Sequence, residues 1–273
     1  MSKTSNMWPF KKMHGLGNNF VIVDAREMTF AVNRERAQAI ADRSRGIGCD
    51  QLIILRNCPE ADVFMEIWNA DGSRVGACGN ATRCVGMILM DETDKVAISI
   101  KTDAGLLAAK RSMLGVSANM GKALTKWNEI PLAIEMDTTG GDFSFGALSS
   151  PGFVNMGNPH AVFFADDAET VDLARIGPQI ETHKLFPERV NVSVASVSGK
   201  TIRLRVWERG AGITQACGSA ACAALVAASR KGLVDRKATI QLDGGELRTE
   251  WLEDGTVEMA GPATLVFTGE CDL

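Results

Sequence analysis

Two stretches of the chain, ACGNATRCVGMILM at residues 77–90 and ACGSAACAALVAASR at residues 216–230, decide how it folds. They are the clearest helical patterns in the sequence, and each helix is expected to begin just after its Cys-Gly pair and to run to about Met90 or Arg230. A strand-like run precedes each of them, and its tryptophan, Trp68 or Trp207, stands ten residues before the cysteine. The sequence therefore predicts one strand–loop–helix unit twice.

The duplication extends beyond these stretches. The cysteine motifs are 139 residues apart, and Gly17-Asn18 matches Gly157-Asn158 at a distance of 140, each followed by a hydrophobic run. Matched features at a near-constant distance indicate two related halves of about 140 residues. We expect an N-terminal lobe of residues 1–119, to which a strand at residues 264–273 returns, and a C-terminal lobe of residues 120–263. A duplication that serves stability alone stays open at this point.

Further strands are predicted from short alternating runs, and further helices from capping residues. Ser198-Gly199-Lys200 and Asp254-Gly255 are typical of hairpin turns. Asn33 is a candidate cap for a helix to about Arg43, and a weaker helix is predicted over residues 172–183. The strands are expected at residues 20–23, 51–55, 63–68, 96–100, 190–197, 201–207 and 256–259.

Composition excludes several classes of protein. The 273 residues carry a formal net charge of −4, too mild a bias to favour nucleic acid or an anionic membrane as partner. No run approaches the roughly 18 apolar residues of a membrane span, and residues 1–12 lack the apolar core of a signal peptide. We therefore expect a cytoplasmic protein. Its seven cysteines form no C-x-x-C pair and it has three histidines, so no metal site is predicted.

The matched cysteines, Cys78 and Cys217, suggest a reaction. A helix start offers unpaired N–H groups and partial positive charge, which lower the pKa of a thiol and bind a carboxylate. If the halves pack about a pseudo-twofold axis, both helix starts can face one substrate. One thiolate could then remove the Cα proton while the opposing thiol protonates the other face, which inverts the stereocentre.

The chain resembles the diaminopimelate epimerase family nearly end to end. The resemblance lies in segments that follow in order: Met13–Phe20, Gly46–Gln51, Asn69–Ser73 leading to Cys78-Gly79-Asn80, Gly157–His160, Glu188–Asn191, Glu208–Gly210 and Cys217-Gly218-Ser219. It implies an α+β fold of two pseudo-symmetric lobes, each a mixed β-sheet or barrel wrapped around a central helix. It also implies interconversion of LL- and meso-2,6-diaminopimelate, on the route to lysine and peptidoglycan, without a cofactor.

The resemblance also implies a role for each matching residue. Cys78 and Cys217 are the expected acid/base pair, and Glu208 is expected to hold the reacting ammonium. The reacting carboxylate is assigned to Gly79, Asn80, Gly218 and Ser219. The distal end of the substrate is assigned to Asn69, Asn158, Asn191 and Arg209, with Asn18 and Gln51 lining the cleft. An arginine, a carboxylate and several amides suit a substrate with two ammoniums and two carboxylates.

Four residues depart from the family pattern. Asn19 stands where Asp is usual, Ala81 and Ala220 replace glycines, and Ile213 replaces a common Glu. The alanines suit a helix interior, where Ala is favoured over Gly by about 1 kcal/mol. The other five cysteines are expected to be buried or incidentally exposed, the two tryptophans to be core residues, and His14 and His160 to orient neighbours by hydrogen bonds.

Other functions remain open. A racemase for proline or hydroxyproline would use the same pair of cysteines, although the polar residues assigned to a distal substrate end argue against it. A thiol–disulfide redox protein needs a resolving geometry and a partner surface that the sequence does not reveal. A binding module without activity is disfavoured because both cysteines are present. The expected partner is a small molecule, and a homodimer is left open.

Overall fold

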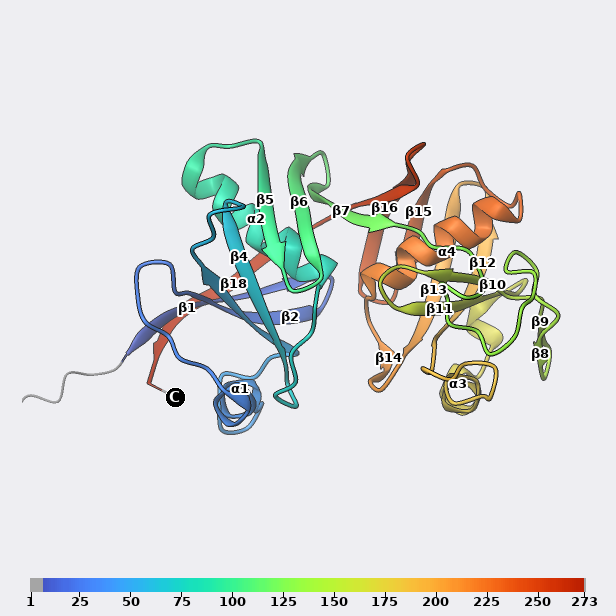
Figure 1. Cartoon of the computed structure of the whole chain (residues 1–273), viewed down its shortest axis with the longest axis horizontal. Helices are drawn as coiled ribbons and strands as arrows, with labels where there is room; N and C mark the ends of the chain where they lie inside the picture. The colour runs from blue at the N-terminus through green and yellow to red at the C-terminus, as the bar shows by residue number, and fades with distance from the viewer. Residues whose placement is uncertain (1–6, 273) are drawn as a thin grey trace, which may run out of the picture. The chain divides into compact units, whose positions relative to one another are not determined.

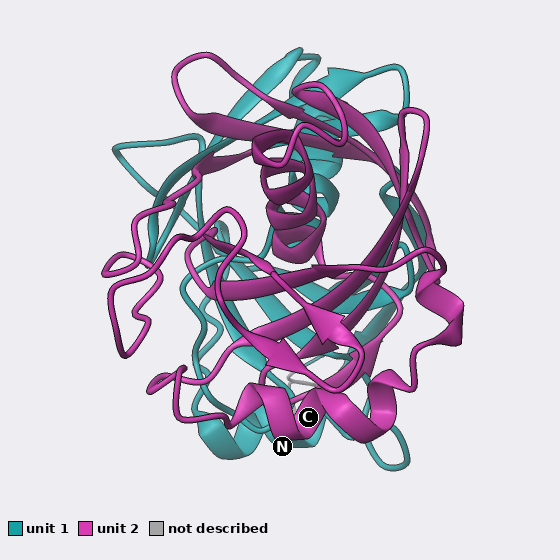
Figure 2. Ribbon diagram, turned by 90° about the vertical axis from the view of Figure 1, so that its right-hand side faces the viewer, with its two compact units in different colours: residues 1–118, 262–273 teal, residues 119–261 magenta. Residues whose placement is uncertain are grey.

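The computed structural model, drawn in Figure 1, describes residues 7–272. The chain divides into two compact units, Met1–Ala118 with Pro262–Leu273, and Asn119–Gly261, which Figure 2 colours separately. Residues 1–6 and 273 of the expected N-terminal lobe lie outside the described residues. Each unit encloses hydrophobic clusters of its own.

Unit 1, which holds Met1–Ala118 and Pro262–Leu273, is built on a mixed sheet. Its strands follow the order β7-β6-β5-β4-β3-β2-β1-β18. Helix α1 (Arg34–Ala41) lies in the chain between β2 and β3, and α2 (Gly79–Thr93) between β4 and β5. The strands are β1 (Trp8–Gly15), β2 (Asn18–Asp24), β3 (Gln51–Arg56), β4 (Val63–Asn69), β5 (Ala97–Thr102), β6 (Gly105–Ser112), β7 (Gly115–Lys122) and β18 (Thr264–Cys271).

Unit 2 repeats this plan in the order β10-β11-β12-β13-β15-β16-β17. Helix α3 (Leu173–Glu181) precedes β12, and α4 (Gly218–Arg230) precedes β15. The remaining elements are β8 (Ser144–Phe145), β9 (Leu148–Ser149), β10 (Gly152–Asn155), β11 (Pro159–Phe164), η1 (Ala168–Thr170), β12 (Asn191–Ser198), β13 (Thr201–Glu208), β14 (Gly212–Thr214), β15 (Lys237–Leu242), β16 (Gly245–Trp251) and β17 (Thr256–Gly261).

The two sheets share one pairing pattern. From β1 to β7, neighbouring strands pair antiparallel, parallel, antiparallel, parallel, antiparallel and antiparallel. The strands from β10 to β17 follow the same sequence of pairings. The register agrees as well. Phe20 pairs with Gln51 in unit 1 and His160 pairs with Asn191 in unit 2, and each residue of the second pair lies 140 positions after its counterpart in the first. The predicted α+β fold with duplicated lobes is confirmed.

A nearly all-buried helix lies at the centre of each sheet. Ten of the 13 residues of α4 are buried alanine, glycine, cysteine, leucine or valine, and Figure 2 shows strands curving around a helix in unit 2. A helix that is apolar on all sides must be enclosed. Small side chains allow strands to approach it: a Cβ added to Gly152 would lie 2.7 Å from the Cβ of Ala227. The helix starts are therefore held rigidly at one end of each core.

Most predicted elements are present with small shifts of their ends. Helix α1 begins after Asn33, whose Oδ1 accepts a hydrogen bond from the Arg36 amide at 2.9 Å. Both predicted hairpin turns are found, with Gly199 and Gly255 at positive φ. The strand expected at residues 264–273 is present as β18. Strands β6, β7, β15 and β16 were not predicted from the sequence, although buried residues alternate with less buried ones in β15 and along much of β16.

Candidate functional site

In unit 1, Cys78 occupies the N-cap of α2. Its backbone is extended (φ −149°, ψ 112°) and its side chain makes no capping hydrogen bond. The amide of Thr82 is the first to bond back, to the Cys78 carbonyl at 2.9 Å. The amides of residues 79–81 therefore have no carbonyl partner within the helix, which is the arrangement that binds anions. Gly79 and Asn80 belong to this buried first turn.

Asn18 connects β2 to this helix start. Its Oδ1 accepts a hydrogen bond from Asn80 Nδ2 at 3.1 Å and lies 3.9 Å from the Sγ of Cys78. A second group forms at the ends of β3 and β4, where Gln51 Nε2 donates to Asn69 Oδ1 at 3.0 Å. The structure thus brings together Asn18, Cys78 and Asn80, and separately Gln51 and Asn69.

In unit 2, Cys217 is the N-cap of α4 with a similar extended backbone (φ −123°, ψ 112°). Its Sγ lies 3.5 Å from the hydroxyl of Ser219. Burial raises the pKa of the Cys217 thiol well above its usual value, and the charge of Glu208 adds to the increase. The N–H of Ala220 and the Ser219 hydroxyl act in the opposite direction. The helix start therefore acts on the pKa of Cys217 in the predicted direction, but desolvation and Glu208 outweigh it and the net shift is upward.

Glu208 ends β13 and faces this thiol. The hydroxyl of Thr214, on the paired strand β14, donates a hydrogen bond to Glu208 Oε1. The next residue, Arg209, is exposed, and its Nη1 donates to the carbonyl of Glu188 at 2.7 Å. A carboxylate beside the thiol and a guanidinium directed away from the core suit one substrate ammonium and one substrate carboxylate.

Asn191 and Asn158 have partners inside unit 2. The buried Asn191 side chain donates to the carbonyl of Pro159 at 2.9 Å and accepts from the amide of Arg209 at 2.9 Å. Asn158 Oδ1 lies 2.9 Å from Nε2 of His160. Full burial lowers the pKa of His160 to about 3, so its ring is neutral at pH 7. Asn191 thus braces the backbone that presents Arg209, and His160 orients Asn158.

The remaining cysteines have no part in these groups. Cys49, Cys84 and Cys222 are buried, and burial raises the pKa of Cys49 to about 11 and that of Cys84 to about 12. Cys58 and Cys271 are half-buried. The expectation that these five thiols are packing residues or incidentally exposed agrees with their positions.

The structure locates the four residues that depart from the family pattern. Ala81 and Ala220 are fully buried in the first turns of α2 and α4. Ile213 is 45% exposed on β14 opposite Trp207, and nothing in the structure explains why it replaces a charge. Asn19 donates from its Nδ2 to Asp50 and accepts at its Oδ1 from Lys12, which an Asp could not do without placing two carboxylates together.

Sequence reasoning missed several supporting residues. Asp50 receives donors from Asn18 and Asn19, although its motif, Gly46–Gln51, had been noted. The buried Glu181 accepts hydrogen bonds from Trp207 Nε1 at 2.7 Å and from the amide of Gly210 at 3.1 Å, which fixes the turn after Arg209. A buried glutamate at the end of a weak helical pattern carries no signal of its own in a single sequence.

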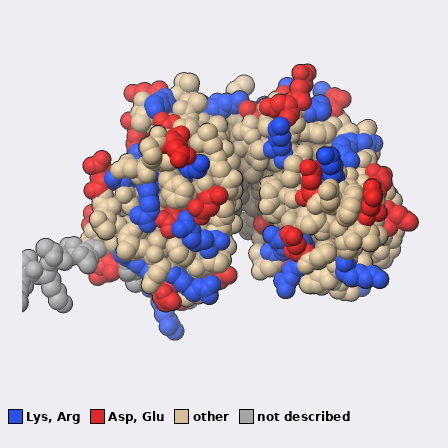
Figure 3. Space-filling model, in the orientation of Figure 1, with Lys and Arg blue, Asp and Glu red and all other residues tan. Residues whose placement is uncertain are grey.

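Residues 7–272 contain no group of three His, Cys, Asp or Glu side chains able to hold a metal ion, and no helix that is long and apolar enough to cross a membrane. Basic and acidic side chains are interspersed on the face of each unit in Figure 3. One open pocket of about 580 Å³ on unit 1 is lined by Gln38, Ala41, Asp42, Arg43, Cys49, Asp50 and Ala70.

Solved structures with the same fold define its class. A phenazine biosynthesis protein of the PhzF family from Bacillus anthracis matches with a TM-score of 0.69 at 14% identity, over 98% of this chain and 99% of that one. A hydroxyproline epimerase from Agrobacterium vitis matches with a TM-score of 0.66 at 14% identity, over 100% of this chain and 94% of that one. At such identities the likeness establishes the fold alone, a duplicated sheet around two central helices.

Sequence comparison identifies the family within this fold. The family model for diaminopimelate epimerase matches residues 10–126 and 152–266. A diaminopimelate epimerase from Phenylobacterium zucineum is 54% identical over 96% of this chain and 97% of its own length. One from Rhodospirillum centenum is 52% identical over 96% of this chain and 91% of its own length. The chain belongs to the diaminopimelate epimerase family.

Proposed function

We propose that this protein is an isomerase that interconverts LL- and meso-2,6-diaminopimelate with two cysteines and no cofactor, as a step toward lysine and peptidoglycan. The observation that carries the proposal is the matched pair of N-cap cysteines, Cys78 and Cys217, at the starts of the two central helices. Neither thiol is used to cap its helix. A buried helix that begins at a thiol, with first-turn amides that have no carbonyl partner within the helix, suits acid–base chemistry on a carboxylate substrate.

The proposed chemistry is one proton removed and one proton added at Cα. The thiolate of one cysteine takes the Cα proton, and the electron pair of the broken C–H bond is held by the carboxylate as an enolate. The thiol of the other cysteine then protonates the opposite face. The first cysteine ends as a thiol and the second as a thiolate, and the reverse reaction exchanges these roles.

The first turns of the two helices would stabilise the enolate. The amides of residues 79–81 and 218–220 precede the first i−4 bonds, which are made by Thr82 and Ala221. A helix start contributes about 0.3–2 kcal/mol to the binding of an anion, and more charge resides on the carboxylate in the transition state than in the substrate. Gly79, Asn80, Gly218 and Ser219 would bind this carboxylate, which is the role that the family resemblance implies for them.

Glu208 would hold the reacting ammonium and thereby activate Cys217. Without substrate, the charge of Glu208 favours the thiol form of Cys217. A bound ammonium neutralises this charge, so the thiolate becomes accessible only when substrate is present. This arrangement would protect the resting thiol from unwanted reactions.

At the distal end, Arg209 would bind the second carboxylate through its guanidinium. Asn158 would donate an amide N–H, because His160 engages its Oδ1. Asn191 would act indirectly, since its side chain already holds the Arg209 backbone. Asn18, Gln51 and Asn69 would contribute neutral hydrogen bonds from unit 1. A substrate without a distal amino-acid end, such as proline, leaves these groups without partners, which disfavours it.

The decisive experiment follows exchange of the α-proton in deuterated water, starting separately from the LL and meso isomers, without any added cofactor. Mass spectrometry counts incorporated deuterium, and chiral chromatography separates the isomers. We expect both isomers to interconvert, with deuterium at the inverted centre. Cys78→Ala and Cys217→Ala should each abolish inversion while circular dichroism stays unchanged. Near-normal turnover in either variant would refute the two-base mechanism, and proline or hydroxyproline turnover in place of diaminopimelate would refute the substrate.

We further propose the cytoplasm as the compartment, because the mechanism requires two reduced thiols. A homodimer is proposed through β18, which ends the sheet order of unit 1. Its Leu265, Val266 and Phe267 are 46%, 54% and 47% exposed. An edge strand with apolar side chains pairs readily, and antiparallel pairing with its own copy closes a twofold dimer. Light scattering should give a dimer that Val266→Lys converts to a monomer, and a monomeric parent protein would refute this assembly.

A further inference from the structure

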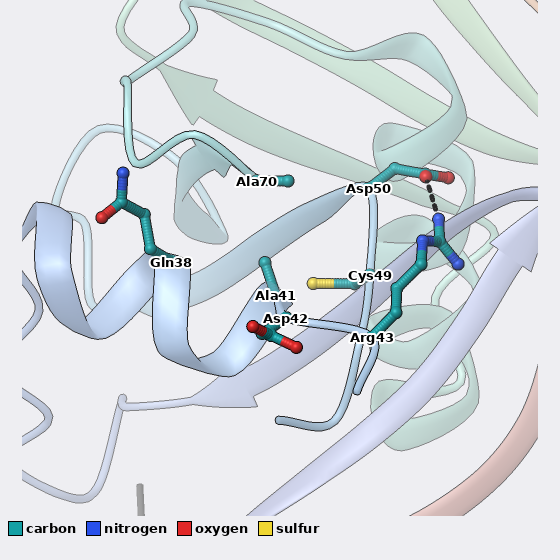
Figure 4. Close-up of a pocket in the computed structure, with 7 residues that line it drawn as sticks. All are labelled: Gln38, Ala41, Asp42, Arg43, Cys49, Asp50 and Ala70. Carbon is teal, nitrogen blue, oxygen red and sulfur yellow. Dashed lines mark hydrogen bonds and ion pairs between the residues drawn. The ribbon is translucent and has the colours of Figure 1, made fainter. Parts of the chain in front are cut away.

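Asp50 is the centre of a hydrogen-bond cluster in unit 1 that the proposed mechanism does not use. It lies just before β3, and its Oδ2 accepts from the amide of Asn19 at 2.8 Å, from Asn19 Nδ2 at 2.8 Å and from Asn18 Nδ2 at 3.2 Å. Its Oδ1 forms an ion pair with Arg43 Nη2 at 2.6 Å, drawn in Figure 4. The Asp50 backbone is fixed as well. Its N–H donates to the carbonyl of Asn19, and its carbonyl accepts from the N–H of Ala70.

This cluster determines how the Asn18 side chain is turned. A carboxylate can only accept hydrogen bonds, so the Asn18 end that faces Asp50 must be the NH₂ group. The other end, Oδ1, then faces two donors, Nδ2 of Asn80 at 3.1 Å and the Sγ of Cys78 at 3.9 Å. Turning the amide over would set an oxygen against the carboxylate and an NH₂ against the NH₂ of Asn80. Both contacts are repulsive, and the observed orientation is therefore the stable one.

Unit 2 lacks this arrangement. The shared register places Val190 at the position of Asp50, since Asn191 matches Gln51. Val190 is a buried apolar residue, and Asn158, which matches Asn18, bonds instead to His160. The cluster is thus specific to the unit that carries Cys78. Asn19, one of the departures from the family pattern, adds the NH₂ donor that an Asp would not supply.

We infer that Asp50 is a positioning residue: it locks Asn18 so that an amide oxygen faces Cys78 and Asn80, which holds Cys78 as a thiol in the resting protein. An acceptor beside Sγ stabilises S–H and offers nothing to a thiolate. The inference rests on the proposed function, in which Cys78 alternates between acid and base. It assigns the resting enzyme a form in which Cys78 is the proton donor.

Several charged or titratable groups surround the cluster. Asp50 is flanked by Arg43, by the adjacent Cys49 and by Lys12 of β1, whose Nζ bonds Asn19 Oδ1 at 2.6 Å. Burial lowers the pKa of Lys12, and Asp50 opposes that effect. On the side of Cys78 lie Arg83 and Cys84 of α2, and His14 accepts from the amide of Gly17 beside Asn18. Removing Asp50 therefore changes both a charge and a hydrogen bond, and the test must separate them.

The test compares two substitutions of Asp50 by their effect on Cys78. Asp50→Asn removes the charge but keeps an oxygen for Asn18 and Asn19, whereas Asp50→Ala removes both. The rate of alkylation of Cys78 by iodoacetamide, measured by peptide mass mapping between pH 6 and 10, reports the thiolate. In Asp50→Ala the freed NH₂ of Asn18 can turn toward Sγ, so we expect alkylation at pH 7 to rise about tenfold above Asp50→Asn, the scale of one hydrogen bond to a charged group.

The same pair of substitutions in an Asn18→Ala background shows whether Asn18 carries the effect. In that background, Asp50→Ala and Asp50→Asn should give the same rate of Cys78 alkylation. Asp62→Ala is the matched control, because Asp62, just before β4, likewise accepts hydrogen bonds from a basic side chain and from backbone and side-chain groups: Lys95 Nζ and the N–H and hydroxyl of Ser99. It should leave the alkylation profile of Cys78 unchanged. Circular dichroism checks folding, and Asp50→Glu should restore a profile close to the parent if Asp50→Ala is unstable.

The results that would overturn this inference differ from those that would refute the proposed function. Equal alkylation in Asp50→Ala and Asp50→Asn, or a difference that persists without Asn18, would overturn the inference. A parent protein that fails to epimerise diaminopimelate would refute the proposed function, while the alkylation series would still decide whether Asp50 acts through Asn18. If both hold, kcat/KM for epimerisation should also fall in Asp50→Ala, and its pH profile should shift in the same direction as the alkylation profile.

Discussion

Replacing Cys84 by alanine should make the protein more resistant to alkaline pH. Cys84 is buried in α2, and burial raises the pKa of its thiol from 9.0 to about 12. A thiol with a raised pKa in the folded state stabilises that state below about pH 9, and this contribution is lost as the pH rises through 12, because only the unfolded chain ionises easily. Three pKa units correspond to about 4 kcal/mol in total.

At pH 10.5 the loss is calculable for each buried thiol of unit 1. The unfolded thiol is then about 97% ionised and the Cys84 thiol hardly at all, so Cys84 accounts for about 2 kcal/mol of lost stability. Cys49, with a pKa of about 11, accounts for a similar amount. The chain has no tyrosine, which removes the other common source of alkaline unfolding near this pH.

Urea unfolding followed by tryptophan fluorescence at pH 7.5 and 10.5 measures the effect. At pH 7.5, Cys84→Ala should be less stable than the parent by about 1–2 kcal/mol, because the core loses a sulfur atom. Between the two pH values it should lose about 2 kcal/mol less than the parent. Cys58→Ala, which removes a half-buried thiol, is the control. An equal loss in Cys84→Ala and the parent would refute the assignment of alkaline instability to buried thiols.

Three further predictions concern the site. Arg209→Lys should weaken diaminopimelate binding in calorimetry by about 1–3 kcal/mol, since an ammonium cannot form two parallel bonds to a carboxylate, and unchanged affinity would exclude a carboxylate contact. Glu208→Gln should increase the alkylation of Cys217 at pH 8 several-fold while abolishing epimerisation, because the carboxylate opposes the thiolate; unchanged alkylation would contradict this. Asn19→Asp should lower the free energy of unfolding at pH 7 by about 1–3 kcal/mol, with the loss shrinking below pH 5 as a carboxyl is protonated beside Asp50; a pH-independent loss would argue against that contact.

The sequence predicted the buried elements of this fold best. Strand β3 contains an apolar run at residues 52–55, strand β12 carries valines among serines, and most residues of the central helices are buried, so these patterns are clear. The strand expected at residues 264–273 has no clear strand pattern of its own, because the residues of β18 are exposed on both faces and do not alternate. Strand β16 mixes charges with buried Leu247 and Thr249, and its pairing with β15 and β17 stabilises it more than its own pattern does.

The identity of the site residues was predictable from residue type and order along the chain. Properties that depend on burial were harder to predict. Cysteines that follow a strand and open a helix are visible in the sequence, and the structure places both at N-caps. The direction in which the pKa of Cys217 shifts was not predictable, because the shift depends on desolvation and on Glu208, which lies nine residues away in the chain. The bracing role of Asn191 was likewise hidden, since its partners, Pro159 and Arg209, are 32 and 18 residues distant.

Comparing matched positions shows how a duplicated fold yields a site that is not symmetric. The backbone register is shared, yet the position of Glu208 in unit 2 is held by Asn69 in unit 1, and that of Arg209 by Ala70. The charged groups that suit a zwitterionic substrate thus belong to unit 2 alone. In unit 1, the carboxylate of Asp50 is bound to neighbouring amides and Arg43, where it acts on Asn18 rather than on substrate. Exchanging the two residues, with Asn69→Glu and Glu208→Asn in one chain, should therefore abolish epimerisation, because Cys217 would lose the carboxylate that responds to the substrate ammonium. Turnover of diaminopimelate close to that of the parent protein in this double variant would contradict the reasoning.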